Sequence, residues 1–516
     1  MKKFYLIILL IHQLVYSQNV TLDTAFGNGG HVITPNTSEI LKLDLFSDGK
    51  IIAVGYTNTV ISTSYHHLTL AKYNVNGTLE SSFGTNGIVN TNIGYSELPN
   101  AVYIQTDDKI LVAGNYRDNS YTETQTGSGA FLVRYNADGS LDTGFGVNGI
   151  IKTNFISNSP IYNFHSISLL SDNSIIVSAG CKDPLTNLYV DALVKFNPDG
   201  SFASNFGTNG ILPLYFPGTN GISIYSFKVL PDDTILCCGS QNTAGIDQSM
   251  MIEKLNSDGT INTAFGVNGM RKVETSIDTE YCTQMVVNND GTVLLFGLNS
   301  NEGFFIKLLP NGDLDSAYGS NGLALTSAFV QNEFQILPNG KILLGNERAL
   351  APYVYAVDAN FAFSAEVYNS DGTSANSFNA PNNYFNIDFG LYNDYNEAIK
   401  LQPDGKLLMG GSSRITSNTS YTNFALTRIN LYQNLSNPDF NNTKISLFPN
   451  PNNGNFKLNK SENYSIEIFD LLGQNVFVKK GIYSTTDIIT NLKKGIYIVK
   501  IIPETGKSST EKLIVK

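Results

Sequence analysis

Hydrophobic and polar positions along the chain form a pattern that returns at intervals of about 60 residues. In one period, Ala101–Gln105 alternates in hydrophobicity and ends at the polar turn Asp107-Asp108. An almost continuous apolar run follows at 109–114, and a second alternating segment with its turn occupies 131–139. Residues 141–151 then lead into a last strand. This pattern predicts four short antiparallel strands, and therefore one sheet per period.

The second strand of each period is apolar on both faces, so protein must cover it on both sides. Sheets packed radially against one another meet this requirement, and the result is a β-propeller. The sequence therefore predicts an all-β fold built from repeated four-stranded blades. A solenoid of stacked repeats is the competing architecture, because a fixed period fits it as well.

A short phrase, aromatic-Gly-x-Asn-Gly, marks each period just before the last strand. Its aromatic residues are spaced by 57, 62, 61, 59 and 53 residues, the first copy is one residue short, and an eroded seventh copy is at Phe378. The six clear copies begin at Phe26, Phe83, Phe145, Phe206, Phe265 and Tyr318.

The ends of the repeat region predict how the ring closes. The turn after the first strand occurs seven times, from Asp48-Gly49 to Asp404-Gly405, and third strands also number seven. The chain begins near residue 21 with a fourth strand alone and ends its last repeat after a third strand. A strand near His31-Val32-Ile33 would complete that last sheet and remove an exposed edge. We therefore expect a seven-bladed propeller closed by an N-terminal strand, whereas a solenoid needs no matching half-repeats.

Composition adds the expected compartment. Residues 1–17 have the form of a signal peptide, with Lys2 and Lys3 before an apolar core, and no other segment has the apolar length of a membrane helix. The net charge is −11 and charged residues make up 15% of the chain, so the basic surface that nucleic acid requires is missing. The mature protein is expected to be exported and soluble.

Four cysteines, at 181, 237, 238 and 282, are too few for a disulfide framework in a body of this size. The favoured interpretation is that they are small buried hydrophobic residues. A bond from Cys237 or Cys238 to Cys282 in the next repeat stays open.

The repeat stops at a linker, residues 434–444, after a propeller region spanning 18–433. The following segment, 445–516, carries a net charge of +4, against −17 for residues 18–444. This change marks a domain boundary. Alternating strands separated by Pro and Gly predict a small C-terminal β-sandwich.

The C-terminal segment resembles the type A C-terminal sorting domain of the type IX secretion system, found in Bacteroidetes-like bacteria. The resemblance rests on Pro-Asn-Pro at 449–451, Asp-Leu-Leu-Gly at 470–473, Leu-x-x-Gly-x-Tyr at 492–497 and a Lys-rich end. It implies export through that machinery to the cell surface or the medium. The residues that carry it are Pro449, Asn450, Pro451, Gly473, Gly495, Tyr497, Lys512 and Lys516.

The repeat region resembles the bacterial delta-60 repeat family, whose Leu-Asp-x-x-Phe-Gly phrase matches residues 141–146. The resemblance covers most of 21–430 and implies a propeller-like fold. It implies no activity and no catalytic residues.

Length variation is gathered in the loops between strands two and three and between strands four and one, which share one face of a propeller. Variable loops on a rigid scaffold are the usual place for binding function. These loops are aromatic, and Tyr beside polar partners suits sugar rings or peptides. The predicted ligand-binding residues are Tyr65, His66, Tyr95, Tyr116, Arg117, Tyr121, Tyr162, Tyr189, Tyr353, Tyr384, Tyr392 and Tyr395.

No catalytic signature is found, and neither a cofactor nor a metal is expected. The Asn-x-Asp-Gly segments, such as 136–139, lack the ligand run of a calcium loop and are typical of hairpin turns. We therefore expect a secreted binding or adhesion propeller for glycan or protein. The alternatives are a hydrolase or lyase acting on extracellular polysaccharide in the propeller mouth, and a structural surface component.

Overall fold

The computed structural model describes two compact units, residues 1–433 and 434–516. Its described residues are 20–58, 66–118, 128–153, 161–183, 189–215, 222–242, 248–273, 281–298, 303–326, 333–349, 361–375, 383–390, 392–414, 422–431, 447–448, 450, 452–458, 464–470, 474–482, 488–503 and 509–516. These residues form strands and turns, and no helix capable of crossing a membrane occurs among them.

Within these residues, the first unit contains seven antiparallel sheets, numbered here along the chain. The first sheet is β3 (Glu39–Leu45), β4 (Ile51–Asn58), β5 (His66–Tyr73) and β6 (Ile88–Thr91). The second is β7 (Ser96–Ile104), β8 (Ile110–Arg117), β9 (Ser128–Tyr135) and β10 (Ile150–Lys152). The third is β11 (Ile161–Leu169), β12 (Ile175–Lys182), β13 (Tyr189–Phe196) and β14 (Ile211–Pro213). The fourth is β15 (Ile222–Val229), β16 (Ile235–Asn242), β17 (Gln248–Leu255) and β18 (Met270–Val273).

The fifth sheet is β19 (Tyr281–Val287), β20 (Val293–Leu298), β21 (Gly303–Leu308) and β22 (Leu323–Thr326). The sixth is β23 (Phe334–Ile336), β24 (Ile342–Ala349), β25 (Phe361–Tyr368) and β26 (Tyr384–Ile387). The seventh is β27 (Asp394–Leu401), β28 (Lys406–Ser413) and β29 (Asn423–Asn430), with β1 (Thr21–Leu22) and β2 (His31–Thr34) paired to β29.

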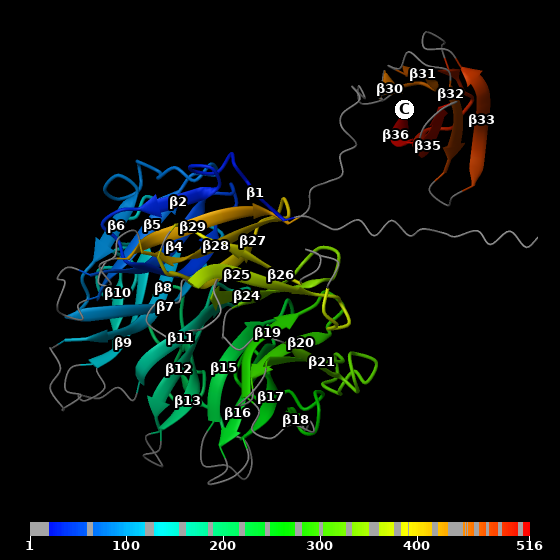
Figure 1. Cartoon of the computed structure of the whole chain (residues 1–516). Coiled ribbons are helices and arrows are strands. Elements are labelled where there is room, and N and C mark those ends of the chain that lie inside the picture. Colours follow the sequence, from blue (N-terminus) through cyan, green and yellow to red (C-terminus); the bar gives the residue numbers. More distant parts are fainter. Residues whose placement is uncertain are drawn as a thin grey trace, which may run out of the picture. The chain divides into compact units, whose positions relative to one another are not determined.

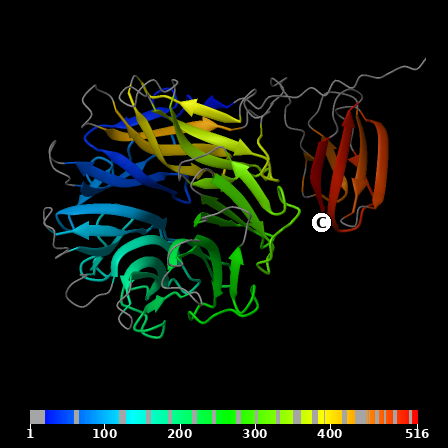
Figure 2. The same ribbon diagram turned by 60° about the horizontal axis from the view of Figure 1, so that its bottom comes forward.

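The sheets are arranged around a common centre (Figures 1 and 2). Their first strands lie innermost and contact one another in the order β3, β7, β11, β15, β19, β23 and β27, and β27 also contacts β3. The unit is an all-β fold with a propeller arrangement, as the repeat predicts.

Each second strand packs against both neighbouring sheets. In β8, Ile110 and Val112 belong to a core shared with the first sheet, whereas Leu111 and Ala113 belong to a core shared with the third. All four side chains are completely buried. The prediction that both faces of this strand are covered is therefore confirmed.

Consecutive sheets are joined by contact between an aromatic ring and a turn glycine. The ring of Phe83, in the phrase of the first sheet, faces Gly139 in the Asn-x-Asp-Gly turn of the second. The Gly84 amide also donates to the Asp138 carbonyl at 2.8 Å. A Cβ atom on the turn glycine would lie within 3.0 Å of the preceding ring in six pairs: Phe26 and Gly77, Phe83 and Gly139, Phe145 and Gly200, Phe206 and Gly259, Phe265 and Gly312, and Tyr318 and Gly372. We call this contact the ring–glycine clasp.

A cation from the third strand reinforces the clasp. The Arg134 guanidinium lies over the Phe145 ring at 4.3 Å and donates to the Asp142 carboxylate at 2.8 Å. Its Nη1 atom also donates to the Pro198 carbonyl in the third sheet, at 2.6 Å. The Leu-Asp-x-x-Phe-Gly phrase thus holds an arginine that reaches the next sheet.

The Asn-x-Asp-Gly segments are hairpin turns, as predicted. The Asp138 carboxylate accepts from the Ser140 amide at 2.9 Å and from its hydroxyl at 2.7 Å. No group of three or more His, Cys, Asp or Glu side chains suited to a metal ion is found in the described part of the chain.

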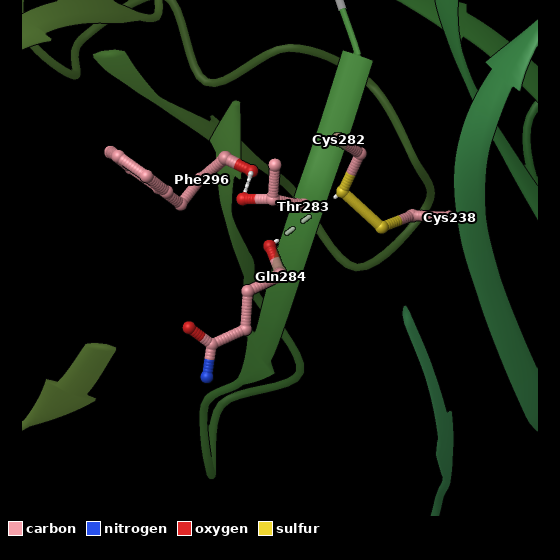
Figure 3. The surroundings of a disulfide bond; sticks show 5 residues. All are labelled: Cys238, Cys282, Thr283, Gln284 and Phe296. Carbon is pink, nitrogen blue, oxygen red and sulfur yellow. Dashed lines mark hydrogen bonds between the residues drawn. A yellow bond between two sulfur atoms is a disulfide. The ribbon is translucent and has the colours of Figure 1, made fainter. Parts of the chain in front are cut away.

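A disulfide joins the fourth and fifth sheets (Figure 3). Cys238 of β16 is bonded to Cys282 of β19, which corrects the favoured interpretation of all four cysteines as unpaired hydrophobic residues. Cys181 and Cys237 are free and buried. Sequence spacing could not choose Cys238 over Cys237, because neighbouring strand residues point to opposite faces and only packing shows which face meets β19.

The second unit contains two sheets around one apolar core. Its strands are β30 (Leu447–Phe448), β31 (Asn455–Leu458), β32 (Tyr464–Phe469), β33 (Asn475–Ile482), β34 (Ile488–Ile489), β35 (Gly495–Pro503) and β36 (Ser509–Val515). The Asn450 side chain donates to the Lys512 carbonyl at 2.5 Å and accepts from the Ile514 amide at 2.9 Å. The Asn of the Pro-Asn-Pro segment therefore fastens the terminal strand.

Replacing Gly139 by Ala is expected to destabilise the first unit. Gly139 has φ +87°, and an added Cβ would lie 2.9 Å from a ring carbon of Phe83. Gly405→Ala is the matched control, because Gly405 has φ +83° and nothing within 4 Å of an added Cβ. Backbone strain alone costs about 1–2 kcal/mol, and forcing the ring away adds about 1–3 kcal/mol. Thermal unfolding should show the larger loss for Gly139→Ala; equal losses would contradict the clasp.

Removing the disulfide is also expected to lower stability. The bond closes a loop with a sequence separation of 44, for which chain entropy gives about 4 kcal/mol at most. Cys282→Ala and mild reduction should lower the unfolding midpoint by similar amounts, and reduction should not affect the variant further. Cys181→Ala is the control that keeps the disulfide. A midpoint insensitive to both changes would show that the bond contributes nothing.

Candidate functional site

The innermost strands carry a β-bulge at a corresponding position. Within the described residues, pairing of six first strands with their second strands skips one residue at this position. In the sixth sheet, Glu333 directly precedes β23, and its carbonyl accepts from the Gly345 amide at 3.0 Å. The skipped residues are Leu41, Asn100, His165, Tyr225, Thr283 and Glu397.

A glycine on the second strand permits the bulge. A Cβ atom on Gly114 would lie 2.1 Å from the Leu98 carbonyl oxygen of the inner strand. Gly55, Gly239 and Gly411 approach the backbone of their inner strands equally closely. A bulge adds a residue to one strand and redirects its side chain. Each blade can therefore present a different bulge residue on a constant backbone.

The inner strands surround a cavity of about 720 Å³. Its wall includes the bulge residues Asn100, His165, Tyr225 and Thr283, together with Glu333. Lys42, Asp44, Tyr103, Lys228 and Lys400 add charged and phenolic groups. A cavity of this volume is within the range that holds small ligands.

Ion pairs and hydrogen bonds brace this wall. Lys400 Nζ lies 2.7 Å from Asp44 Oδ1, and the Ile104 amide donates to Asp44 Oδ2 at 3.1 Å. Lys42 Nζ lies 3.3 Å from Glu333 Oε1. These contacts connect β27, β3 and β7, and link β3 with the sixth sheet. Much of the wall's charge is therefore already paired.

Three glutamates influence one another electrostatically: Glu39 at the start of β3, Glu397 in β27 and Glu347 in the second strand β24. Glu39 begins β3 and accepts a hydrogen bond from the Tyr56 hydroxyl at 2.5 Å. Burial raises the pKa of Glu397, the bulge residue of β27, to about 7, and the nearby charges of Glu39 and Glu347 reinforce the shift. Burial and Glu39 likewise raise the pKa of Glu347. Glu397 therefore keeps its proton at a pH where an ordinary carboxyl is ionised.

Some predicted ligand residues come together between the first and second sheets. The His66 ring stacks on Tyr56 at 4.1 Å, and burial, with the charge of Arg117, lowers the pKa of His66. The Tyr95 amide donates to the Arg117 carbonyl at 2.5 Å. Tyr116 is 2% exposed, and its hydroxyl donates to the Thr153 carbonyl at 2.8 Å. Tyr116 thus exposes no ring face to a ligand. Its prediction as a ligand-binding residue is wrong, because it belongs to the hydrophobic core between the first and second sheets.

The other described members of the set are in separate places. Tyr162 and Tyr189 meet edge to face at 5.9 Å in the third sheet, where Tyr189 is 59% exposed. Tyr384 lies under the Arg348 guanidinium at 3.8 Å. Tyr395 stacks on Phe361 at 6.1 Å, and Tyr392 is partly buried just before β27. These contacts do not form one continuous aromatic surface.

Several predicted residues lie outside the described residues: Tyr65, Tyr121, Tyr353, Pro449, Pro451 and Gly473. Of the described sorting residues, Gly495 begins β35, and the Tyr497 hydroxyl donates to the Lys493 carbonyl at 2.8 Å. Lys512 lies in β36, and Lys516 follows it; the Lys516 amide donates to the Asn452 carbonyl at 2.9 Å.

Sequence reasoning missed the cavity residues, because Asn100, His165, Tyr225 and Lys228 have no common chemistry or motif. One signal was available. The apolar second strands carry a glycine at a fixed point, as in Ala113-Gly114 and Cys238-Gly239. A glycine inside a strand often marks a bulge or a close backbone approach.

Comparisons with known proteins agree with a propeller that carries an export signal. Residues 446–516 match the family described as "Secretion system C-terminal sorting domain". Residues 47–83 and 105–145 match "Domain of unknown function (DUF5122) beta-propeller". The chain therefore carries a type IX secretion C-terminal sorting domain, which directs it to the cell surface or extracellular space. A comparison with curated proteins finds no match.

Solved structures give only distant likenesses. PorZ, a surface component of the type IX secretion system of Porphyromonas gingivalis, is 10% identical with a TM-score of 0.37; the match covers 94% of this chain and 60% of PorZ. The Dos1 propeller is 10% identical with a TM-score of 0.42, covering 80% and 96%. The NanB sialidase of Streptococcus pneumoniae is 12% identical with a TM-score of 0.37, covering 77% and 69%.

Glu397→Gln should change how stability depends on pH. Below about pH 4.5 the carboxyl is protonated in folded and unfolded chains alike. Between about pH 4.5 and pH 7 only the unfolded chain loses this proton, so the wild type loses stability as the pH rises. The Glu397→Gln side chain has no proton to lose in this range, so the variant keeps its stability at this position. Unfolding midpoints at pH 5 and pH 8 should favour the variant more at pH 8.

Glu80→Gln is the control for this prediction. A hydrogen bond from Lys50 lowers the pKa of Glu80. Glu80→Gln should therefore lower the unfolding midpoint more at pH 8 than at low pH, which is the opposite of the direction expected for Glu397→Gln. A pH-independent effect of Glu397→Gln would contradict the protonated state of Glu397.

Proposed function

We propose that the first unit is a closed, seven-bladed propeller. The pairing of His31 with Thr427 across β2 and β29 supports closure. So does the Arg428 guanidinium, which donates to Asp23 at 2.8 Å and lies 4.5 Å from the Phe26 ring centroid. Arg134, Asp142 and Phe145 make the same arrangement within one hairpin of the second sheet. The N-terminal phrase at Phe26 would therefore pack on the seventh sheet in the way that the phrase at Phe145 packs on the second sheet, to which it belongs.

We propose that this propeller is an exported binding or adhesion module whose ligand is a glycan. The observation that carries the proposal is the central cavity, which collects unlike polar side chains from successive blades. A sugar needs hydrogen-bond partners in several directions together with flat surfaces for its rings, and such convergent groups are what small-molecule sites supply. Tyr225 is 46% exposed and provides such a surface in the cavity wall.

The predicted loop residues, His66, Tyr95, Arg117, Tyr162, Tyr189, Tyr384, Tyr392 and Tyr395, remain part of the proposal as an outer contact region. So do Tyr65, Tyr121 and Tyr353, which lie outside the described residues. The division into signal peptide 1–17, propeller 18–433, linker 434–444 and sorting domain 445–516 is likewise proposed. Removal of the signal peptide and recognition of the tail by the secretion machinery would deliver the propeller outside the cell.

A second function, glycan hydrolysis or lysis, is favoured by one observation. Burial and the charges of Glu39 and Glu347 raise the pKa of Glu397 to about 7, so this carboxyl holds its proton in weakly acidic solution. A protonated carboxyl beside an ionised one is the pair that glycoside hydrolysis uses. Propellers can assemble such pairs from separate blades, so the missing local motif does not decide against this function.

A glycan array probed with the labelled mature protein tests the binding function. We expect a hit that weakens about tenfold in Tyr225→Ala, because the variant loses the flat apolar ring on which a sugar would stack. Tyr189→Ala is the matched control on the loop region, and unchanged unfolding midpoints show that both variants fold. Loss in Tyr189→Ala alone would move the site from the cavity to the loops.

The same experiment separates the alternatives. Reducing or unsaturated ends released from a bound glycan, and abolished by Glu397→Gln, would establish the enzyme instead of the binding module. Silence across the array would contradict the glycan proposal and favour a protein partner or a structural role. Self-association in light scattering would identify the structural role.

A further inference from the structure

The charges in the cavity do not balance within the described residues. Lys42 is paired with Glu333, and Lys400 with Asp44. Lys228 of β15 also lines the cavity, but the structure gives it no hydrogen bond or ion pair within the described part of the chain. Glu333 and Lys400 act on it at longer range. One ammonium group is therefore left to face the cavity without a partner.

The Lys228 side chain is exposed to the cavity, so its ammonium group is accessible to a ligand. Lys228 is open to the cavity, but protein surrounds the cavity on its sides, and this partial loss of solvent lowers the pKa of Lys228. A bound anion would supply the electrostatic partner that the Lys228 ammonium group lacks among the described residues. The whole chain has a net charge of −11, so this cation is not part of a generally basic surface.

The surroundings of Lys228 suit the uncharged part of a sugar. Tyr225 and Ser226 lie on the same strand, and His165 and Ser168 of β11 line the same cavity. Hydroxyl and imidazole groups therefore line the same cavity as the ammonium group. Hydroxyl groups of a ligand can donate to and accept from these side chains.

We propose that Lys228 binds the anionic group of the ligand, so that the glycan recognised by the cavity is an acidic one, with a carboxylate or sulfate on the sugar. This inference rests on the proposed glycan-binding function and names the ligand class. The ammonium group contacts the anion, while the neighbouring hydroxyl groups and the Tyr225 ring hold the sugar.

Titration calorimetry of the mature protein with three sugars tests the inference. The probes are glucuronate, glucose 6-sulfate and neutral glucose. We expect at least one acidic sugar to bind about tenfold or more tightly than glucose, because a hydrogen bond to a charged group is stronger than one between neutral groups. Lys228→Gln should remove this preference, so that the acidic sugars bind no more tightly than glucose. The stronger acidic probe identifies the anion as carboxylate or sulfate.

Lys182→Gln is the matched control. Lys182 ends β12 outside the cavity lining, and its loss changes the net charge equally. If both variants weaken the binding of acidic sugars to the same extent, the effect comes from the net charge of the protein and the inference fails. An unchanged or raised unfolding midpoint in Lys228→Gln shows that the fold is intact.

The outcomes distinguish this inference from the function on which it rests. Equal binding of neutral and acidic sugars, lost in Tyr225→Ala but kept in Lys228→Gln, would overturn the acidic ligand and keep the glycan-binding function. Binding of inorganic sulfate at Lys228 without any sugar would overturn both, because the cavity would then hold a simple anion. Absence of all binding would also contradict both.

Discussion

The contact between an aromatic ring and a turn glycine joins six of the seven neighbouring sheet pairs among the described residues, and much of the first unit depends on it. A glycine is required in the Asn-x-Asp-Gly turn for a geometric reason beyond its positive φ: a side chain at Gly139 would meet the Phe83 ring of the preceding sheet. The Phe-Gly phrase supplies both the ring and the Gly84 amide that bonds to the same turn. Two motifs that lie in different repeats are therefore two halves of one interface.

The clasp lies in the connections between third and fourth strands, which leaves the inner strands free to vary. Their backbones keep one bulge, opposite a second-strand glycine such as Gly114. The bulge side chains differ, from Asn100 to His165 and Tyr225. The fold thus separates support from recognition. A blade can change its bulge residue without disturbing the clasp or the buried second strand, and this separation makes the cavity a better place for a specific site than the tight turns.

Export fits the chemistry of the molecule. Because the sorting domain directs the chain to the cell surface or beyond, the Cys238–Cys282 bond belongs to an environment that permits disulfides. Within the tail, Asn450 hydrogen-bonds on both sides of Leu513 in the last strand. One residue of the Pro-Asn-Pro motif therefore has a structural explanation, namely holding the end of the chain in its sheet.

The sequence alone determined the all-β class, the repeated four-stranded sheets and the sorting tail, because strand alternation, turn residues and the period are local properties that can be read along the chain. The aromatic loop residues were predicted as one surface, but the structure buries Tyr116 and distributes the other described members among separate sheets. Only tertiary structure could decide this, because a ring's exposure depends on what the neighbouring blade places against it.

The cavity, too, could be found only in the tertiary structure. Asn100, Tyr225, Lys228 and Glu333 are far apart in the sequence, and packing the sheets around one centre brings them to a common wall. The tertiary structure also determines that Cys238 and not Cys237 forms the disulfide, because the pairing depends on which face of β16 packs against β19.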